Sequence, residues 1–182
     1  MKKRFLYSKF VKFFALLICL PFYRKKYLKG YFFDQKRAGF IWAIKGIPMR
    51  IRSKVPWPIS KHTFITNHKN ISFDQDSINV FQSPGCYFQA IDAKIKIGKN
   101  VHIGPNVGII TTNHNPSNLR EHLEGEDVLI GDNTWIGMNS VILPGVVLGP
   151  NTIVGAGSVV NKSFPDGGCL IAGVPARFIK NL

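Results

Sequence analysis

The sequence has few of the residues that mark several large classes of protein. Its three cysteines, Cys19, Cys86 and Cys169, are odd in number and widely spaced, which argues against a disulfide framework or a CxxC metal site. Acidic residues are also scarce, with 10 Asp and Glu against 24 Lys and Arg. No apolar run approaches the roughly 20 residues that a membrane-spanning helix needs. We therefore expect a cytoplasmic protein that does not cross a membrane.

The positive charge is concentrated at one end of the chain. Residues 1–61 contain 16 of the 24 Lys and Arg but one acid, Asp34, for a formal charge of +15, whereas the other residues sum to −1. A length of 182 residues fits one compact domain plus an appendage. We predict a basic, partly helical N-terminal extension over residues 1–60 and a second domain over residues 61–182.

The first thirty residues place an apolar run, Phe13 to Tyr23, between basic clusters. We interpret residues 1–30 as an interfacial helix on the inner face of the cytoplasmic membrane, with Lys and Arg toward anionic headgroups. A helix packed on the rest of the protein or on a neighbouring subunit is one alternative. A removed signal peptide is another, although no small-x-small cleavage site follows the run. The aromatic residues do not alternate on a polar sheet face, so we expect no nucleic acid partner.

A six-residue repeat occupies most of the second domain. An aliphatic residue recurs at every sixth position in two runs, Ile91, Ile97, Ile103, Ile109 and Ile130, Ile136, Ile142, Leu148, Val154, Val160. Neither the period of a helix nor that of an ordinary strand explains a repeat of six. A solenoid explains it, because each hexad then forms one short strand and a turn, with its aliphatic residue inside and glycine at the turn.

These hexads resemble the repeats of the hexapeptide-repeat acyltransferases, over roughly the last hundred residues. The resemblance implies an all-β solenoid, a left-handed parallel β-helix with three hexads per triangular coil. It also implies acetyl-CoA as the co-substrate and a homotrimer with active sites between subunits. The phase of the repeat is broken over residues 61–90, where we expect irregular first coils.

The repeat stops at Asn113 and resumes by Ile130, so we expect residues 115–127 to leave the solenoid as a loop. Such insertions gather on one face, which is often the binding face. Acyl transfer to a hydroxyl needs a base, and histidine, with an unperturbed pKa of about 6.5, is suited to this task. Five histidines are present: His62, His68, His102, His114 and His122. Only His114 sits where the coil gives way to the loop.

The segments Gly104-Pro105-Asn106-Val107 and Thr111-Thr112-Asn113-His114 also resemble those around the catalytic histidine of galactoside, maltose and polysaccharide O-acetyltransferases. The resemblance implies that His114 is the general base and that the acceptor attacks acetyl-CoA directly, without an acyl-enzyme. Some relatives have an acidic residue after this histidine, whereas Asn115 follows here. What orients the imidazole is therefore open between a backbone carbonyl and a residue of another subunit, and the oxyanion donor is unassigned.

The resemblance continues through the second run of hexads to Arg177. It implies that Trp135 and Met138 line the donor groove and that the backbone at Ala156 bonds the pantetheine arm. The further residues of the implied coenzyme A site are Asn161, Lys162, Arg177 and Lys180. The alternative reading is that the turn around Ala156 is only structural and that the C-terminal cations are a solvated tail.

We therefore predict an O-acetyltransferase that acetylates a sugar hydroxyl in a bacterial surface polysaccharide or its lipid-linked precursor. Transfer to an amino sugar, or to a small molecule such as serine, is the nearest alternative. A γ-type carbonic anhydrase needs three histidines on zinc; we expect no metal, because His114 and His122 are eight residues apart and the second lies in the loop. A membrane-tethered scaffold without activity is the non-enzymatic alternative.

Overall fold

The computed structural model describes residues 9–28 and 39–182. The chain divides into two compact units, Met1–Lys61 and His62–Leu182. Of the predicted interfacial segment 1–30, residues 1–8, 29 and 30 lie outside the described part. Within that part, no helix combines the length and the apolarity needed to cross a membrane.

The described part of the first unit is a set of short helices: α2 (Lys9–Cys19), η1 (Lys25–Leu28), α3 (Gly39–Lys45) and α4 (Ile47–Ser53). Pro48 lies at the start of α4, where its missing N–H breaks no helical hydrogen bond. The helices enclose a small core of six buried residues, Ala15, Cys19, Tyr23, Leu28, Phe40 and Ala43. The Tyr23 hydroxyl donates to the Ala43 carbonyl at 2.9 Å, which satisfies its polar end, and burial raises the pKa of Cys19 to about 11.

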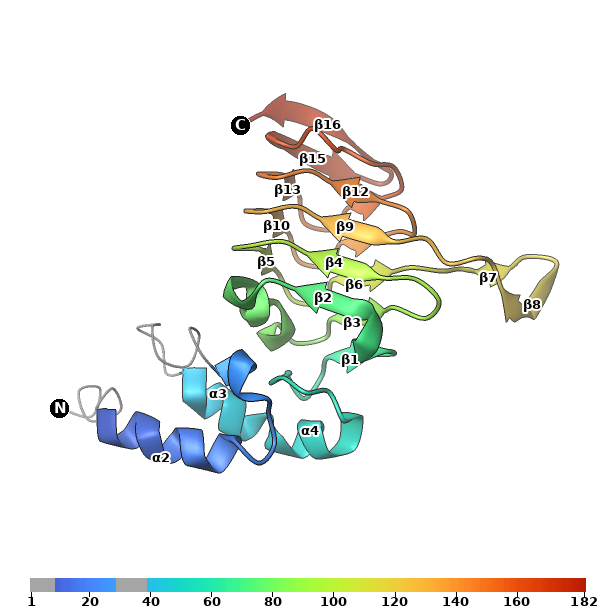
Figure 1. The fold of residues 1–182 in the computed structure, drawn as a ribbon. Helices are drawn as coiled ribbons and strands as arrows, with labels where there is room; N and C mark the ends of the chain where they lie inside the picture. The colour runs from blue at the N-terminus through green and yellow to red at the C-terminus, as the bar shows by residue number, and fades with distance from the viewer. Residues whose placement is uncertain (1–8, 29–38) are drawn as a thin grey trace. The chain divides into compact units, whose positions relative to one another are not determined.

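Parallel strands of the second unit form three sheets (Figure 1). Sheet A contains β1 (Phe64–Ile65), β3 (Tyr87–Gln89), β6 (Gly108–Ile110), β11 (Val141–Ile142) and β14 (Val159–Val160). Sheet B contains β2 (Ile71–Phe73), β4 (Ile95–Ile97), β9 (Val128–Ile130) and β12 (Val147–Leu148). Sheet C contains β5 (His102–Ile103), β10 (Trp135–Ile136), β13 (Ile153–Val154), β15 (Cys169–Gly173) and the antiparallel β16 (Ala176–Asn181). From β4 to β14, strands outside the extruded segment join sheets B, C and A in turn, so the chain winds as a triangular solenoid.

The aliphatic residues of the hexads form the core of this solenoid. Strand register aligns them in columns: Ile97, Ile130 and Leu148 in sheet B; Ile103, Ile136 and Val154 in sheet C; and Ile109, Ile142 and Val160 in sheet A. All of these side chains are buried. Because each coil covers the apolar residues of the next, the stability of the unit comes mainly from contacts between neighbouring coils.

The glycines of the hexads have a different role from the expected one. None of Gly131, Gly137 and Gly149 has a positive φ; the left-handed turn positions of these hexads are taken by asparagine at Asn133, Asn139 and Asn151, and by glycine only at Gly145 and Gly157. A Cβ at Gly137 would lie 2.5 Å from the backbone nitrogen of Ala156 in the next coil. These glycines are therefore needed for the close approach of neighbouring backbones, whereas asparagine tolerates the turn conformation.

The first coil is irregular, as its broken repeat predicts. The short helix η3 (His68–Asn70) precedes β2, and the helix η4 (Gln75–Gln82) packs beside β5, on the side where later coils have a strand of sheet C. The Ser77 hydroxyl in η4 donates to the Gly98 carbonyl at 2.7 Å. Residues between β6 and β9 leave the solenoid as an antiparallel hairpin of β7 (His114–Asn115) and β8 (Asn118–His122), which projects from the stacked strands (Figure 1).

Candidate active site

His114 is the first residue of the projecting hairpin. Its Nδ1 atom lies 2.9 Å from the backbone oxygen of Leu119. A carbonyl oxygen can only accept, so this contact assigns the hydrogen to Nδ1 and leaves the Nε2 lone pair unprotonated in the neutral ring. The imidazole is exposed. The geometry therefore presents an accessible basic nitrogen at the junction of coil and hairpin.

An irregularity in the hairpin brings the Leu119 carbonyl to the ring. Asn115 pairs with Asn118, but the preceding residue His114 pairs with His122, so three residues of β8 are bypassed. Bulges of this kind redirect groups locally. The same register places the two imidazoles together, with ring centroids 4.4 Å apart and planes inclined by 32°. The two histidines are therefore in contact although eight residues separate them in the sequence.

Hydrogen bonds fix the base of the hairpin to the solenoid. The side-chain oxygen of Gln89 in β3 accepts from the backbone N–H groups of Thr111 and Thr112, both at 3.1 Å. The Thr112 hydroxyl donates to the Leu123 carbonyl at 2.8 Å. The Leu123 N–H donates to the Asn113 carbonyl at 2.9 Å. The residues on either side of the hairpin are thus joined to each other and to a strand of sheet A.

Asp127 holds the chain where it re-enters sheet B. One carboxylate oxygen accepts from the Lys94 backbone N–H at 2.8 Å, and the other accepts from the Lys96 ammonium group at 3.0 Å. These two hydrogen bonds, the backbone one first, hold the pKa of Asp127 below its usual value, because they favour the charged carboxylate. The end of the extruded segment is therefore tied to β4 by a charged group.

Three of the predicted donor residues lie on adjacent coils. Trp135 in β10 pairs with Ile153, and its side chain is 54% exposed, which is high for an indole. Met138, 46% exposed, accepts through its carbonyl from the Gly157 N–H at 2.8 Å, so its turn stacks on the turn that contains Ala156. Trp135, Met138 and Ala156 are thus close in the fold, and two large apolar side chains are uncovered in the single chain.

The other predicted donor residues are more dispersed. Asn161 and Lys162 follow β14, whereas Ala156 lies in the turn before it, so the two groups flank opposite ends of that strand. The Lys162 ammonium lies 5.5 Å from the centre of the Phe164 ring. Arg177 and Lys180 are exposed on β16. A ligand that contacts all of these residues has to be long, which is a property of coenzyme A.

Known proteins share this repeat and this fold. The family model for bacterial transferase hexapeptide repeats (six repeats) matches residues 127–162. A hexapeptide-repeat acetyltransferase from Vibrio cholerae is 30% identical in a superposition that covers 68% of this chain and 69% of that chain, with a TM-score of 0.55. The chain belongs to the hexapeptide-repeat acetyltransferases. The resemblance of the hexads to the hexapeptide-repeat acyltransferases is thereby confirmed.

Two relatives of this hexapeptide-repeat acetyltransferase are named for sugar substrates. The structure of a maltose O-acetyltransferase from Clostridium difficile 630 is 34% identical, covering 68% of this chain and 65% of that chain with a TM-score of 0.57. The galactoside O-acetyltransferase of Escherichia coli K12 is 42% identical over 95 residues, which are 50% of this chain and 46% of that protein. The chain spans about half the length of the curated relatives that it matches.

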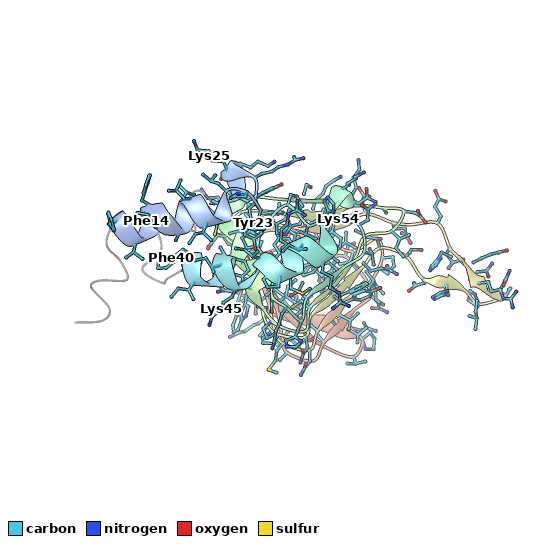
Figure 2. All side chains as sticks on the ribbon, turned by 90° about the horizontal axis from the view of Figure 1, so that it is seen from below. Phe14, Tyr23, Lys25, Phe40, Lys45 and Lys54 are labelled. Carbon is cyan, nitrogen blue, oxygen red and sulfur yellow. The ribbon has the colours of Figure 1, made fainter. Side chains whose placement is uncertain are left out.

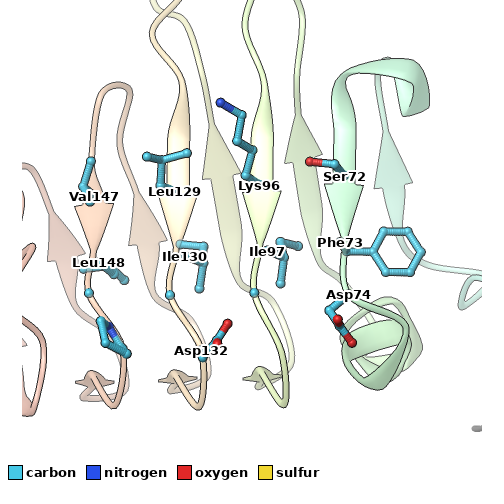
Figure 3. A pocket seen from close by; sticks show the side chains of 14 residues that line it. Ser72, Phe73, Asp74, Lys96, Ile97, Leu129, Ile130, Asp132, Val147 and Leu148 are labelled. Carbon is cyan, nitrogen blue, oxygen red and sulfur yellow. The ribbon is translucent and has the colours of Figure 1, made fainter.

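The acetyltransferase chain also carries a shallow depression away from these residues. It has a volume of about 610 Å³ and lies across sheet B, where Phe73, Ile97, Ile130 and Leu148 follow one another on adjacent strands (Figure 3). Neither His114 nor any predicted donor residue lines it. We therefore do not place the reaction there.

The sequence of this acetyltransferase did not indicate three groups around His114: the Leu119 carbonyl, the His122 ring and the Gln89 side chain. A backbone carbonyl has no sequence signal at all. The role of Gln89 has no sequence signal either, because the sequence does not show which residues of the next coil lie above it. The histidine pair depends on a hairpin register that is set by a bulge, which the eight-residue spacing does not reveal.

Proposed function

We propose that this chain is an acetyl-CoA-dependent O-acetyltransferase that acetylates a sugar hydroxyl. His114 is the general base in this proposal. The observation that carries it is the hydrogen bond from His114 Nδ1 to the Leu119 carbonyl, because it leaves Nε2 free to accept a proton at an exposed position. The family membership supports acetyl transfer, and the names of the maltose and galactoside relatives support a sugar acceptor.

The reaction follows from this placement. The acceptor oxygen attacks the thioester carbonyl carbon while His114 Nε2 takes the hydroxyl proton. The tetrahedral intermediate then collapses, the carbon–sulfur bond breaks, and the imidazolium returns the proton to the leaving thiolate. The products are an acetyl ester and coenzyme A. No cysteine is needed as a nucleophile, since Cys19, Cys86 and Cys169 are all buried.

We also propose that the enzyme is a homotrimer of left-handed coils with its sites between subunits. The uncovered Trp135 and Met138 support this arrangement, because large apolar side chains on a rigid coil are suited to being covered by the donor and a neighbouring chain. In this proposal Ala156, Asn161 and Lys162 line the path of the pantetheine arm. Arg177 and Lys180 meet the phosphates of coenzyme A.

The acceptor in this proposal belongs to a surface polysaccharide or its lipid-linked precursor, at the inner face of the cytoplasmic membrane. Helix α2 supports a peripheral membrane contact. Val11, Ala15 and Cys19 face the core of the first unit, while a second apolar set, Phe10, Phe13, Phe14, Leu17 and Ile18, is exposed. Figure 2 labels Phe14 of this set on α2. The described residues of this unit include ten Lys and Arg and no Asp or Glu. A helix with an uncovered apolar face in a basic unit fits an anionic lipid surface.

Release of coenzyme A tests the proposal. Purified protein is supplied with acetyl-CoA and a panel of free sugars, lipid-linked oligosaccharides, amino sugars and serine. We expect acceptor-dependent release, greatest with a saccharide hydroxyl, and a loss of about 10²–10⁴-fold in His114→Ala, as is typical for a general base. His62→Ala is the matched control, because His62 is an exposed histidine in the turn before β1. Equal rates for His114→Ala and wild type would remove His114 from the mechanism.

A further inference from the structure

His122 contacts the face of the candidate base. The two residues are directly opposite each other on β7 and β8, and their ring centroids are 4.4 Å apart with planes inclined by 32°. Directly opposed side chains on antiparallel strands are within contact distance, and pairs of flat rings interact favourably beyond the area that they bury. This contact joins two of the five histidines where the coil gives way to the hairpin.

The hydrogen bond to Leu119 alone does not fix the direction of His114 Nε2. It holds one atom of the ring, Nδ1, at 2.9 Å from the carbonyl oxygen. The ring can still tilt about that contact, since the second side-chain torsion of histidine is broad. Both His114 and His122 are exposed, so the solenoid core does not hold the ring. A flat partner on the ring face restricts this tilt.

We propose that His122 is a positioning residue, whose ring packs on His114 and directs Nε2 toward the acceptor hydroxyl. This inference rests on the proposed function, in which Nε2 takes the proton. A base must lie within hydrogen-bonding reach of that proton, and small misplacements are costly in rate. His122 acts through the shape of its ring, so its nitrogen atoms are not required.

Two substitutions separate the shape of the ring from its chemistry. His122→Ala removes the packing surface, and we expect kcat to fall about 10- to 100-fold with the KM for acetyl-CoA nearly unchanged, as for a misplaced catalytic group. His122→Phe keeps a flat ring without nitrogen atoms, and we expect it to retain kcat within about threefold of wild type. His62→Ala is the control, and thermal unfolding of each variant checks that the fold is intact.

A kinetic result opposite to either expectation overturns the inference. If His122→Phe is as impaired as His122→Ala, the nitrogen atoms of His122 act in the reaction. If His122→Ala matches wild type, the ring contact does not position His114. Loss of the native melting transition in His122→Ala alone would assign the residue to hairpin folding rather than to positioning.

A readout without turnover keeps this inference separate from the proposed function. In protein labelled with ¹⁵N only at its five histidines, the ring nitrogens of His114 report the tautomer and the exchange of the Nδ1 hydrogen. We expect one tautomer with a slowly exchanging Nδ1–H in wild type and in His122→Phe, and averaging in His122→Ala. If the protein is inactive with every acceptor but shows this pattern, the proposed function is rejected while the positioning of the His114 ring by His122 is supported. A pattern unchanged in His122→Ala contradicts the positioning role.

Discussion

The Nδ1 atom of His114 is hydrogen-bonded at 2.9 Å to the backbone oxygen of Leu119, five residues later in the same hairpin. The candidate base is thus oriented by its own hairpin. No acidic side chain is needed next to it, which accounts for Asn115 at the following position. The Asn115 side chain instead accepts from the Ser117 N–H at 3.0 Å and stabilises the turn of the hairpin.

The first prediction concerns Leu119, whose side chain is 71% exposed although its carbonyl binds His114. Leu119→Ala keeps the carbonyl, so we expect kcat within about twofold of wild type. Replacing residues 117–121 by Gly-Gly removes that carbonyl, and we expect a loss of about 10²-fold or more, the scale of a misplaced catalytic group. Steady-state kinetics measure both. A large loss in Leu119→Ala would show that the side chain itself contacts the acceptor or another subunit.

The second prediction concerns Gln89, which supplies the acceptor for the Thr112 N–H. Gln89→Leu leaves that buried donor unpaired, so we expect the free energy of unfolding to fall by about 1–3 kcal/mol. We expect kcat to fall as well, because the hairpin loses its attachment to β3. Gln89→Glu keeps an acceptor oxygen and serves as the control. Denaturant unfolding measures the stability of each variant, and initial rates measure its activity. Equal stability of Gln89→Leu and Gln89→Glu would contradict the role of the Gln89 oxygen as the acceptor for the Thr112 N–H.

The third prediction is a pH dependence of stability from Asp127. Its pKa is lowered in the folded protein, so its contribution is present above the usual pKa range of aspartate and is lost as the pH falls through the lowered pKa. The side chain is 42% exposed, so we expect Asp127→Asn to cost only about 0.2–1 kcal/mol at pH 7. Thermal unfolding measured over a range of pH should show that the stability difference between wild type and Asp127→Asn disappears at acidic pH. Asp166→Asn, another exposed aspartate, should show no such difference.

The fourth prediction concerns the exposed apolar face of α2. Phe10 and Phe14 lie on this face, with ring centroids 4.8 Å apart. We expect the double substitution Phe10→Gln, Phe14→Gln to weaken co-sedimentation with vesicles of anionic lipid by about tenfold or more, given the free energy of burying aromatic surface. Added salt should weaken binding of the wild type as well, because the basic residues of this unit contribute.

A matched control for this surface is available in the second unit. Phe64→Gln changes an aromatic side chain that is 62% exposed on β1, close to the 68% of Phe10. Vesicle binding of this control should equal that of wild type. If the wild type does not bind vesicles, or if the α2 variant binds them as well as the wild type, the exposed face of α2 packs against protein instead of lipid.

Much of the fold was predictable because the hexads repeat a local pattern. The positions of Ile97, Ile130 and Leu148 in the sequence were enough to predict that they lie in stacked coils, and their register agrees. The irregular first coil was also predictable from its broken phase. The role of Gly137 was not, because a close approach to Ala156 depends on two segments far apart along the chain.

The sequence by itself determined the repeat, the family and the place where His114 leaves the solenoid, since each of these depends on residue identity at a fixed spacing. Only the tertiary structure decided that the Leu119 carbonyl orients His114, that His122 covers its ring and that Gln89 anchors the hairpin. These contacts depend on a bulged register and on the stacking of separate coils. Backbone atoms and long-range neighbours leave no periodic trace in a sequence, so their positions follow only from the folded chain.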